Sequence, residues 1–338
     1  MQVTANQIEI RVRGKTTSVP SIDVDGREII VTGKWLKIAG LRDEQLVEGE
    51  PVSNPETFAS RLKESCLRAD IFVFVQRLGD ATPNYNYYLR WDNAAVATTA
   101  SFTKWWEKIP QESRKNTRRA AKRGVSVHVT KFNDHLVEGI KRIYDEQPVR
   151  QGRPFWHFGK DFETVKMENA TYPERSEFIG AYHNGELIGF LKLIYVDRTA
   201  RIIQILSMTS HYDKRPMNAL ITKAVEVCHE KGISQLVYGN FSYGNKKNSP
   251  LAEFKRRNGF EQVRFPRYYM PLTLKGRLAL RLRLHLGLSE ILPSQLINLL
   301  VRLRSMAFRI VPNALFKAGV DNSPWEERRN NEGKAANC

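Results

Sequence analysis

The loop HYDKRPMN (211–218) brings together the residues that are best suited to bind a phosphate group. Lys214 and Arg215 stand just before a predicted helix that starts near Pro216, and Asn218 lies in its first turn. The free N–H groups of a helix N-terminus carry a partial positive charge, and two full cations beside them favour a pyrophosphate. The alternative is a basic helix start on a solvated face.

A second segment, RQGRPFWHFGKD (150–161), mixes cations with aromatic rings between two predicted helices. Arginine binds phosphate groups in a bidentate manner, and aromatic faces attract cations, so this composition favours a phosphorylated or sugar acceptor. The candidate substrate-binding residues are Arg150, Arg153 and Trp156, and His157 is the candidate general base.

The first 124 residues predict a mixture of helices and strands. Strands are expected in 8–13, 28–41 and 71–78, and helices in 54–66, 101–109 and 111–123. The stretches NYNYYLRWD and AAVATT are interpreted as a hairpin that turns at Asp92–Asn93.

After Gly124 the hydrophobic pattern predicts one long series of elements in the order β-α-α-β-β-β-α-β-α-β. The series includes a hairpin turn at Asn184–Gly185 and a helix over 216–232. It ends with FEQVRFPRYYMPLT (260–273), which is interpreted as a closing pair of strands.

Residues 125–273 resemble the GNAT (acyl-CoA N-acyltransferase) fold. IGAYHNGELIGFLKLIYVD is similar to its long central hairpin, SMTSHYDKRPMNALITKAVEVCHEKGI to its strand-loop-helix for pyrophosphate, and LAEFKRRNGFEQV to its late helix. The glycine-rich phosphate loop of that family is absent, because Asp213, Arg215 and Met217 stand where small residues are expected. The resemblance implies acyl-CoA, first of all acetyl-CoA, as co-substrate, with no permanently bound cofactor and no metal.

The departure from the glycine-rich pattern is similar to that of the Fem-type peptidoglycan-bridge aminoacyltransferases. These enzymes carry two copies of the fold and use aminoacyl-tRNA. They typically join the halves through a run resembling RKNTRRAAKRGV (114–125) and contain a Phe-Lys pair followed by Gly, as in FKRRNG (254–259). The first 113 residues would then be a shortened partner half.

The GNAT resemblance also implies a place for catalysis. Lys255 falls near the position of a Tyr that protonates the leaving thiolate, and a lysine there can neutralise charge on a tetrahedral intermediate; otherwise it is an exposed helix cation. Strands 202–209 and 234–241 would lie side by side and splay to admit the acyl chain. The N–H groups of Leu206, Ser207 and Met208 are candidates to hold the acyl carbonyl. Asn240 and Tyr243 are candidates to orient the acceptor amine, unless they only form a turn.

The positive charge of the chain is concentrated in two segments. Lys and Arg number 53 against 36 Asp and Glu, a net charge of +17, and residues 111–124 and 275–319 hold most of the excess. The first segment predicts a helix with two lines of cations, which suits tRNA or a phosphate-bearing acceptor; a solvated linker helix is the alternative. In the second, the helix 294–311 has a wide apolar face edged by arginine. This face suits a membrane interface or packing onto the protein itself.

Composition excludes several classes of protein. An apolar fraction of 41% excludes a mostly disordered chain. Three scattered cysteines exclude a disulfide framework, and no Cys/His cluster suits zinc. The N-terminus lacks a secretory signal, and no apolar run is long enough to span a membrane. We therefore expect a cytoplasmic protein, which is peripheral at the inner face of the membrane if 275–319 binds the membrane and does not pack onto the protein itself.

These observations predict an α+β protein in which a GNAT-like transferase domain (125–273) follows an N-terminal α/β half (1–110) and a basic connecting helix (111–124). A basic amphipathic helical extension (274–320) and a disordered tail (321–338) complete the chain. The expected activity is transfer of an acyl group, or as a second choice an aminoacyl group, from acyl-CoA or aminoacyl-tRNA to an amine of a cell-envelope or sugar precursor. The alternative is a non-catalytic nucleic-acid-binding protein that uses the same cations.

Overall fold

The computed structural model describes residues 6–12, 15–150, 152–243 and 249–286. These residues form two compact units. The second unit is Ala94–Gln262, and the first holds the residues up to Asn93 together with those from Val263 on. The chain passes between the units within two strands, β6 (Tyr88–Thr98) and β14 (Glu261–Pro271).

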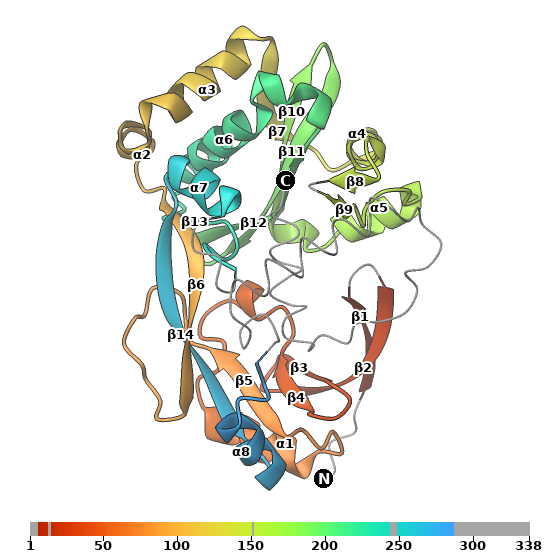
Figure 1. The fold of residues 1–338 in the computed structure, drawn as a ribbon, viewed down its shortest axis with the longest axis vertical. Helices are drawn as coiled ribbons and strands as arrows, with labels where there is room; N and C mark the ends of the chain where they lie inside the picture. The colour runs from red at the N-terminus through yellow and green to blue at the C-terminus, as the bar shows by residue number, and fades with distance from the viewer. Residues whose placement is uncertain (1–5, 13–14, 151, 244–248, 287–338) are drawn as a thin grey trace. The chain divides into compact units, whose positions relative to one another are not determined.

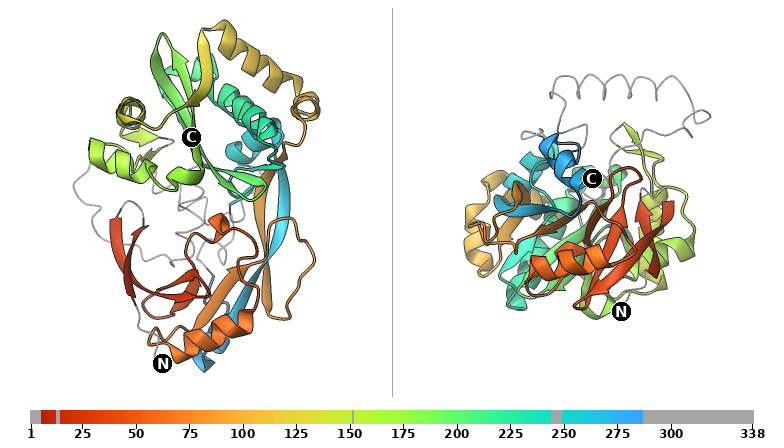
Figure 2. Two further views of the ribbon diagram at one scale, coloured as in Figure 1. Left: turned by 180° about the vertical axis from the view of Figure 1, so that it is seen from behind. Right: turned by 90° about the horizontal axis from the view of Figure 1, so that it is seen from below.

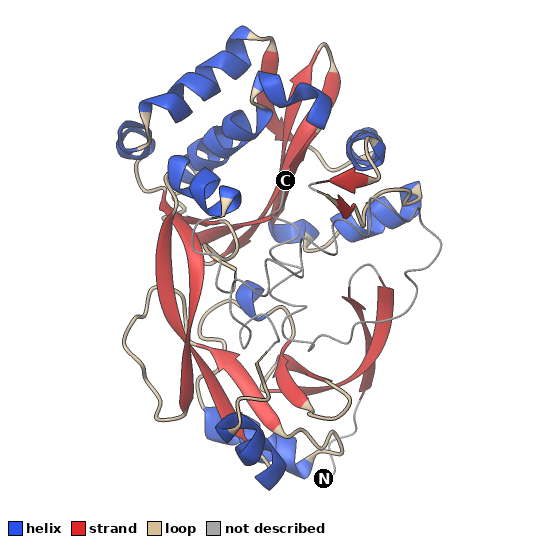
Figure 3. Ribbon diagram, in the orientation of Figure 1, coloured by secondary structure: helices blue, strands red, loops and turns tan. Residues whose placement is uncertain are grey.

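Both of these strands run through positions where the sequence predicted a turn or a break (Figure 3). The expected hairpin at Asp92–Asn93 is wrong, because β6 continues through it and the Asp92 carboxylate accepts a 2.9 Å hydrogen bond from Arg267 of β14. The expected closing strand pair is a single strand. Pro266 does not interrupt β14, since its carbonyl still accepts a hydrogen bond from the Gln76 N–H at 3.0 Å.

In the first unit, six strands pair in the order β1-β2-β3-β4-β5-β14. The strands before β6 are β1 (Asn6–Val12), β2 (Lys15–Val24), β3 (Arg27–Thr32), β4 (Ile38–Leu41) and β5 (Ile71–Val75). A 3-10 turn, η1 (Glu44–Leu46), follows β4. The helices are α1 (Pro55–Glu64) and α8 (Leu274–Arg281).

Successive side chains of β5 point to opposite faces of this sheet, and each face is covered by one helix. Phe72 and Phe74 pack in the cluster that includes Phe58 of α1, whereas Ile71 and Val73 pack with α8. Figure 2 shows α1 and α8 on the two sides of the sheet. The predicted N-cap of α1 is confirmed, since the Asn54 side chain accepts from the Thr57 N–H.

In the second unit, six strands pair in the order β6-β13-β12-β11-β10-β7. The strands after β6 are β7 (Val125–Thr130), β10 (Ser176–His183), β11 (Glu186–Val196), β12 (Thr199–Ser207) and β13 (Gln235–Val237). Two short strands form a separate hairpin, β8 (Val149–Arg150) and β9 (Arg153–Pro154). The Asn184–Gly185 turn between β10 and β11 is confirmed, and both residues have positive φ, as a tight hairpin turn requires.

The helices of the second unit lie on both faces of its sheet (Figure 1). α3 packs on α6, which lies against β10 and β11, and α4 covers β11 from the other face together with α5. The helical elements are α2 (Phe102–Lys108), α3 (Gln111–Lys122), α4 (Asp134–Asp145), α5 (Phe162–Asn169), η2 (Pro173–Arg175), η3 (Thr209–Lys214), α6 (Pro216–Glu230) and α7 (Pro250–Arg257).

The predicted helix 294–311 and the predicted tail 321–338 lie outside the described residues, as does most of 275–319. Within the described part of the chain, no helix is long and apolar enough to cross a membrane.

Candidate active site

The strands β12 and β13 diverge toward their C-terminal ends. They pair in parallel over Thr199–Arg201 and Gln235–Val237, after which β12 continues alone to Ser207. The Met208 N–H donates to the Ile188 carbonyl of β11 at 2.8 Å and is therefore not available to a ligand. Because successive N–H groups of a strand point to opposite neighbours, the Ser207 N–H points toward the side that β13 has left. β12 and β13 thus part as expected, and of these two N–H groups only that of Ser207 faces the side that β13 has left.

Lys255 of α7 is fully buried at the C-terminal end of β13. Its Nζ donates a 2.7 Å hydrogen bond to the backbone carbonyl oxygen of Asn240 and lies 3.5 Å from the Tyr243 hydroxyl. It also lies 4.4 Å from the centre of the Tyr238 ring. The structure thus brings Lys255, Asn240 and Tyr243 together, and the alternative of an exposed helix cation does not apply. Burial lowers the pKa of Lys255 to about 7, because the ammonium loses its hydration.

Helix α7 is held at both ends, which fixes the position of Lys255. At its start the Ser249 hydroxyl accepts from the Ala252 N–H at 3.1 Å. At its end Gly259 has a φ of +80°, and a Cβ there would lie 2.5 Å from Nε1 of Trp105. Only glycine allows α2 to approach so closely.

The segment between β12 and α6 forms the 3-10 turn η3 instead of a glycine-rich loop. Its first N–H groups are occupied by Glu146, whose carboxylate accepts from the Thr209 N–H at 2.7 Å and from the Ser210 N–H at 2.8 Å. Burial opposes ionisation of Glu146, but these hydrogen bonds outweigh it and lower its pKa. A carboxylate of the chain therefore occupies donors of the kind that a pyrophosphate would need.

A pocket of about 540 Å³ opens beside this turn, lined by α3, the start of α6 and α7. Arg215 lines it, is exposed, and has no ion pair within the described part of the chain. Arg257 also lines it but pairs with Glu253 at 2.7 Å. The pocket therefore offers one uncompensated cation to an anionic or polar ligand.

Two other residues singled out from the sequence have different positions at this pocket. Asn218 lines it, is buried, and donates a 3.0 Å hydrogen bond to the Asn258 side chain, which joins α6 to the end of α7. Lys214 is not part of the lining, and its Nζ lies 3.7 Å from Asp213. Of the two predicted phosphate-binding cations, Arg215 is thus the one that faces the pocket.

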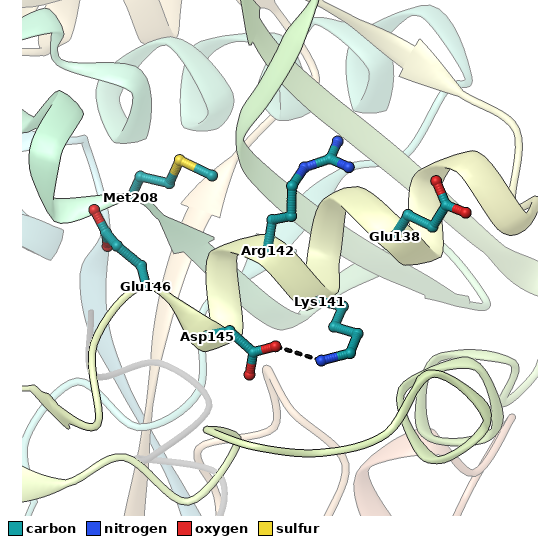
Figure 4. Close-up of a pocket in the computed structure, with 6 residues that line it drawn as sticks. All are labelled: Glu138, Lys141, Arg142, Asp145, Glu146 and Met208. Atoms are coloured by element: carbon teal, nitrogen blue, oxygen red, sulfur yellow. Dashed lines mark hydrogen bonds and ion pairs between the residues drawn. The ribbon is translucent and has the colours of Figure 1, made fainter.

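A second pocket, of about 430 Å³, lies against α4 and the end of β12 (Figure 4). Lys141 and Asp145 form an ion pair along its wall, and Glu146 lies beside Met208 at one end. Glu138 and Arg142 complete the lining. Met208 lines this pocket and Thr209 lines the first, so the two pockets adjoin the same end of β12.

His157 does not occupy a position from which it could act as a general base. It is 5% exposed, stacks on Tyr144 with ring centres 4.1 Å apart, and places Nε2 3.2 Å from the Gln204 amide nitrogen. Burial, together with the charges of Lys160 and Arg150, lowers its pKa to about 2. His157 therefore packs within the second unit, and no contact among the described residues places it beside Lys255.

The predicted substrate-binding residues around β8 and β9 are not brought to Lys255 by any contact among the described residues. Arg150 is buried and donates to the Ser207 carbonyl at 3.1 Å and to the Ile143 carbonyl at 2.7 Å. It therefore supports the end of β12, although it also lines the 540 Å³ pocket. Arg153 is exposed, and the partly exposed Trp156 ring has Lys160 Nζ 3.8 Å from its centre.

Sequence reasoning missed Glu146 and Lys192. Nothing distinguishes Glu146 from the other acidic residues of its helix until the fold places it beside η3. Lys192 is 1% exposed, and its Nζ bonds to the Asn169 and Thr171 carbonyls at 2.8 Å. A lysine inside the apolar strand ELIGFLKLIYV is a signal that could have been noticed. No cluster of three or more metal-ligating side chains occurs in the described ranges.

Solved structures of similar architecture show which fold this chain has. The chain superposes on FemX with a TM-score of 0.53 and 11% identity, over 83% of this chain and 90% of FemX. The C-terminal domain of a lysylphosphatidylglycerol synthetase from Agrobacterium fabrum gives a TM-score of 0.50 and 14% identity, over 78% of this chain and 87% of that domain. The chain has a GNAT-like, Fem-type fold. L-PGS from Bacillus licheniformis matches with a TM-score of 0.50, 14% identity, and coverage of 77% of this chain and 86% of that structure.

These similarities confirm the expected α+β class and the resemblance to the GNAT and Fem-type fold. No family model and no curated protein matches the sequence. At this level of identity the likeness concerns the fold alone. Within that fold, Ser207 ends β12, and Lys255 bonds to Asn240 just beyond β13, the parallel neighbour of β12.

Proposed function

We propose that this protein is a transferase that moves an acyl or aminoacyl group onto an acceptor amine. The observation that carries this proposal is the buried, uncompensated Lys255 at the edge where β12 and β13 splay. In this proposal the donor carbonyl reaches the Ser207 N–H on the side where β13 no longer pairs with β12. A cation in a site without water stabilises negative charge strongly.

In the proposed reaction the acceptor nitrogen attacks the carbonyl carbon of the donor ester or thioester. The Ser207 N–H donates to the developing oxyanion, and the Lys255 ammonium stabilises the charge or gives its proton to the leaving oxygen or sulfur. The new C–N bond forms as the C–O or C–S bond breaks, and the proton lost by the amine passes to solvent. Asn240 positions Lys255 through its backbone carbonyl, and Tyr243 lies beside the ammonium.

The donor is proposed to bind in the 540 Å³ pocket, with Arg215 facing its anionic part. Glu146 already occupies the Thr209 and Ser210 N–H groups, which weakens the case for an acyl-CoA whose pyrophosphate sits on this turn. An aminoacyl ester of tRNA does not require that cradle. The occupied turn therefore favours aminoacyl-tRNA over acyl-CoA, the reverse of the order expected from the sequence.

The basic face of α3 supports the same choice of donor. Ser113 and Ala120 are buried, and Thr117 bonds to Thr222 of α6, so this side faces the protein. The cations lie on the remaining surface, where like charges at helical spacing favour a phosphate-bearing ligand. They are Arg114, Lys115, Arg118, Arg119, Lys122 and Arg123, of which Arg123 pairs with Asp213.

The acceptor is proposed to approach through the 430 Å³ pocket, where the exposed Glu138 carboxylate has no ion pair among the described residues and suits an amine. A cell-envelope precursor or an amino sugar has such an amine. Peripheral contact with an anionic membrane, which the basic segment 275–319 suggested, would bring the protein to an envelope precursor. A non-catalytic nucleic-acid-binding protein would use the same cations, but its binding would not involve the buried Lys255.

The test is a side-by-side assay of donors with the purified chain. Aminoacyl-tRNA, acetyl-CoA and longer acyl-CoAs are each incubated with amine acceptors, and product is measured together with the thermal shift that each donor produces. The proposal predicts saturable turnover with one donor class, with aminoacyl-tRNA favoured. Binding of tRNA, charged or uncharged, without turnover on any acceptor would instead support the nucleic-acid-binding alternative.

A further inference from the structure

Helix α8 packs against the sheet of the first unit with one face and exposes leucines on the other. Gly276, Ala279 and Leu280 are buried. A Cβ at Gly276 would lie 1.9 Å from the Asp70 carbonyl oxygen, so this side of α8 lies directly against the chain at Asp70. Residues four apart lie on the same side of a helix. The exposed leucines therefore form one row, which consists of Leu274 (80% exposed), Leu278 (56%) and Leu282 (57%).

Cations flank this leucine row on both sides. On a helical wheel Lys275 borders one edge and Arg277 and Arg281 border the other, and α8 contains no acidic residue. Trp35, which is 63% exposed, lies next to the row, because Lys275 Nζ donates to its carbonyl and lies 5.3 Å from its ring centre. An apolar stripe edged by cations, with a tryptophan beside it, is typical of a helix that lies in a membrane interface.

A basic pocket of about 570 Å³ opens beside the same row. Its charged lining is Lys37, Lys63, Arg68 and Lys275 against the single carboxylate of Asp70. Asp70 already accepts from the Lys37 N–H at 2.9 Å and pairs with Lys275 at 3.0 Å. Lys63 and Arg68 are exposed and have no ion-pair partner among the residues described. The pocket is therefore positive and has unused donors for a phosphate group.

We propose that the leucine row, Trp35 and this basic pocket form one docking face for an anionic lipid bilayer. The pocket binds the phosphate of a lipid headgroup, while the leucines and Trp35 enter the interface. Lys275 links the two parts, since it lines the pocket and borders the row. A nucleic acid fits less well, because it would leave the leucine row in water. The inference locates the membrane association included in the proposed function and does not depend on the transfer reaction.

The test measures binding of the full chain to vesicles of phosphatidylcholine alone and of phosphatidylcholine mixed with phosphatidylglycerol. Binding is expected only to the mixed vesicles, together with a blue shift of tryptophan emission that the Trp35→Phe variant loses. The Lys63→Glu/Arg68→Asn variant is expected to bind about a hundredfold more weakly, since each cation near such a surface contributes about fivefold. The Leu274→Ser/Leu278→Ser variant is expected to lose about tenfold.

Matched variants control for charge and for exposed apolar surface. Lys104→Glu/Lys131→Gln makes the same change in net charge in the second unit, and Val149→Ser/Met167→Ser removes exposed apolar residues there. Both are expected to bind as the wild type does, and thermal melts check that all variants fold. If the pocket variant and its charge control lose equal affinity for the mixed vesicles, the pocket does not bind the lipid phosphate. If the leucine variant binds these vesicles as the wild type does, the leucine row does not insert into the interface.

Two further results keep this proposal separate from the proposed activity. Transfer assays with soluble substrates, run without vesicles, are expected to be unaffected by these variants, so either proposal can fail while the other stands. If the pocket variant loses affinity for tRNA but not for vesicles, the occupant is a nucleic acid and the docking face is wrong.

Discussion

The Nζ atom of Lys255 lies 2.7 Å from the backbone carbonyl oxygen of Asn240 in a site that solvent does not reach. A carbonyl orients the ammonium but does not cancel its charge. No carboxylate pairs with Lys255 in the described ranges. The Tyr243 hydroxyl lies 3.5 Å from its ammonium, and the Tyr238 ring lies beside it. Such a cation is costly to bury, and it becomes favourable when negative charge develops beside it.

Replacement of Lys255 by Met should therefore abolish most of the activity without unfolding the protein. We expect turnover to fall by about a factor of 10² to 10³, the effect of losing one stabilising group at an oxyanion. Because Met fills a similar volume and removes a buried charge, the melting temperature should stay the same or rise.

Lys192→Met is the matched control, since Lys192 is also a buried lysine. Its ammonium is bound by carbonyl oxygens of Asn169 and Thr171, which the substitution leaves unpaired. We expect it to cost about 1–3 kcal/mol of stability while the turnover of the folded protein is unchanged. Equal losses of turnover in both variants would show that Lys255 has no special role.

The lowered pKa of Lys255 predicts a pH dependence of stability. Its pKa is about 7 in the folded chain and about 10.4 when unfolded, so between these values the unfolded chain binds more protons. Stability relative to Lys255→Met should thus rise with pH through this window, by up to about 1.4 kcal/mol per pH unit, and stay constant below it. Denaturant unfolding of both proteins across this range measures the difference in their free energies of unfolding. If this difference does not change with pH, the pKa of Lys255 is not lowered by burial.

The sequence predicted the elements of the second unit well because each has its own local signal. Asn133 caps α4 as expected, with its side chain accepting from the Leu136 N–H at 2.9 Å, and Asn184–Gly185 forms its turn. The hairpin at Asp92–Asn93 failed because the same dipeptide can lie in a strand when a cross-strand partner, here Arg267, binds the aspartate.

The resemblance to the GNAT fold named Lys255, Asn240 and Tyr243 separately, and only the structure brings them into contact. Glu146 could not be named, because its partners at Thr209 and Ser210 lie on a turn that only the fold brings beside α4. The exposure of Lys255 was also undetermined, since Lys255, Arg256 and Arg257 are indistinguishable until α7 is packed.

Arg215 and Lys214 should differ in their effect on donor binding. Arg215 lines the 540 Å³ pocket, whereas Lys214 does not. Since the Arg215 backbone has φ 59°, Asn is the substitution that tolerates this conformation best. We expect Arg215→Asn to raise the Kd of the donor about tenfold, typical of a lost charge-assisted hydrogen bond, and Lys214→Ala to change it little. Calorimetric titration compares them, and a larger effect at Lys214 would contradict the assignment of the pocket.

Removal of the Glu146 carboxylate should create a binding site for pyrophosphate. In Glu146→Ala the Thr209 and Ser210 N–H groups lose their acceptor, which we expect to cost about 1–3 kcal/mol of stability. The same free donors, with Arg215 nearby on the turn, would then suit an added anion. Inorganic pyrophosphate or coenzyme A should therefore raise the melting temperature of Glu146→Ala but not that of the wild type. Glu138→Ala, on the same helix but without contact to this turn, should behave as the wild type does. A wild-type protein that coenzyme A already stabilises would contradict this account of the turn and restore acyl-CoA as the donor.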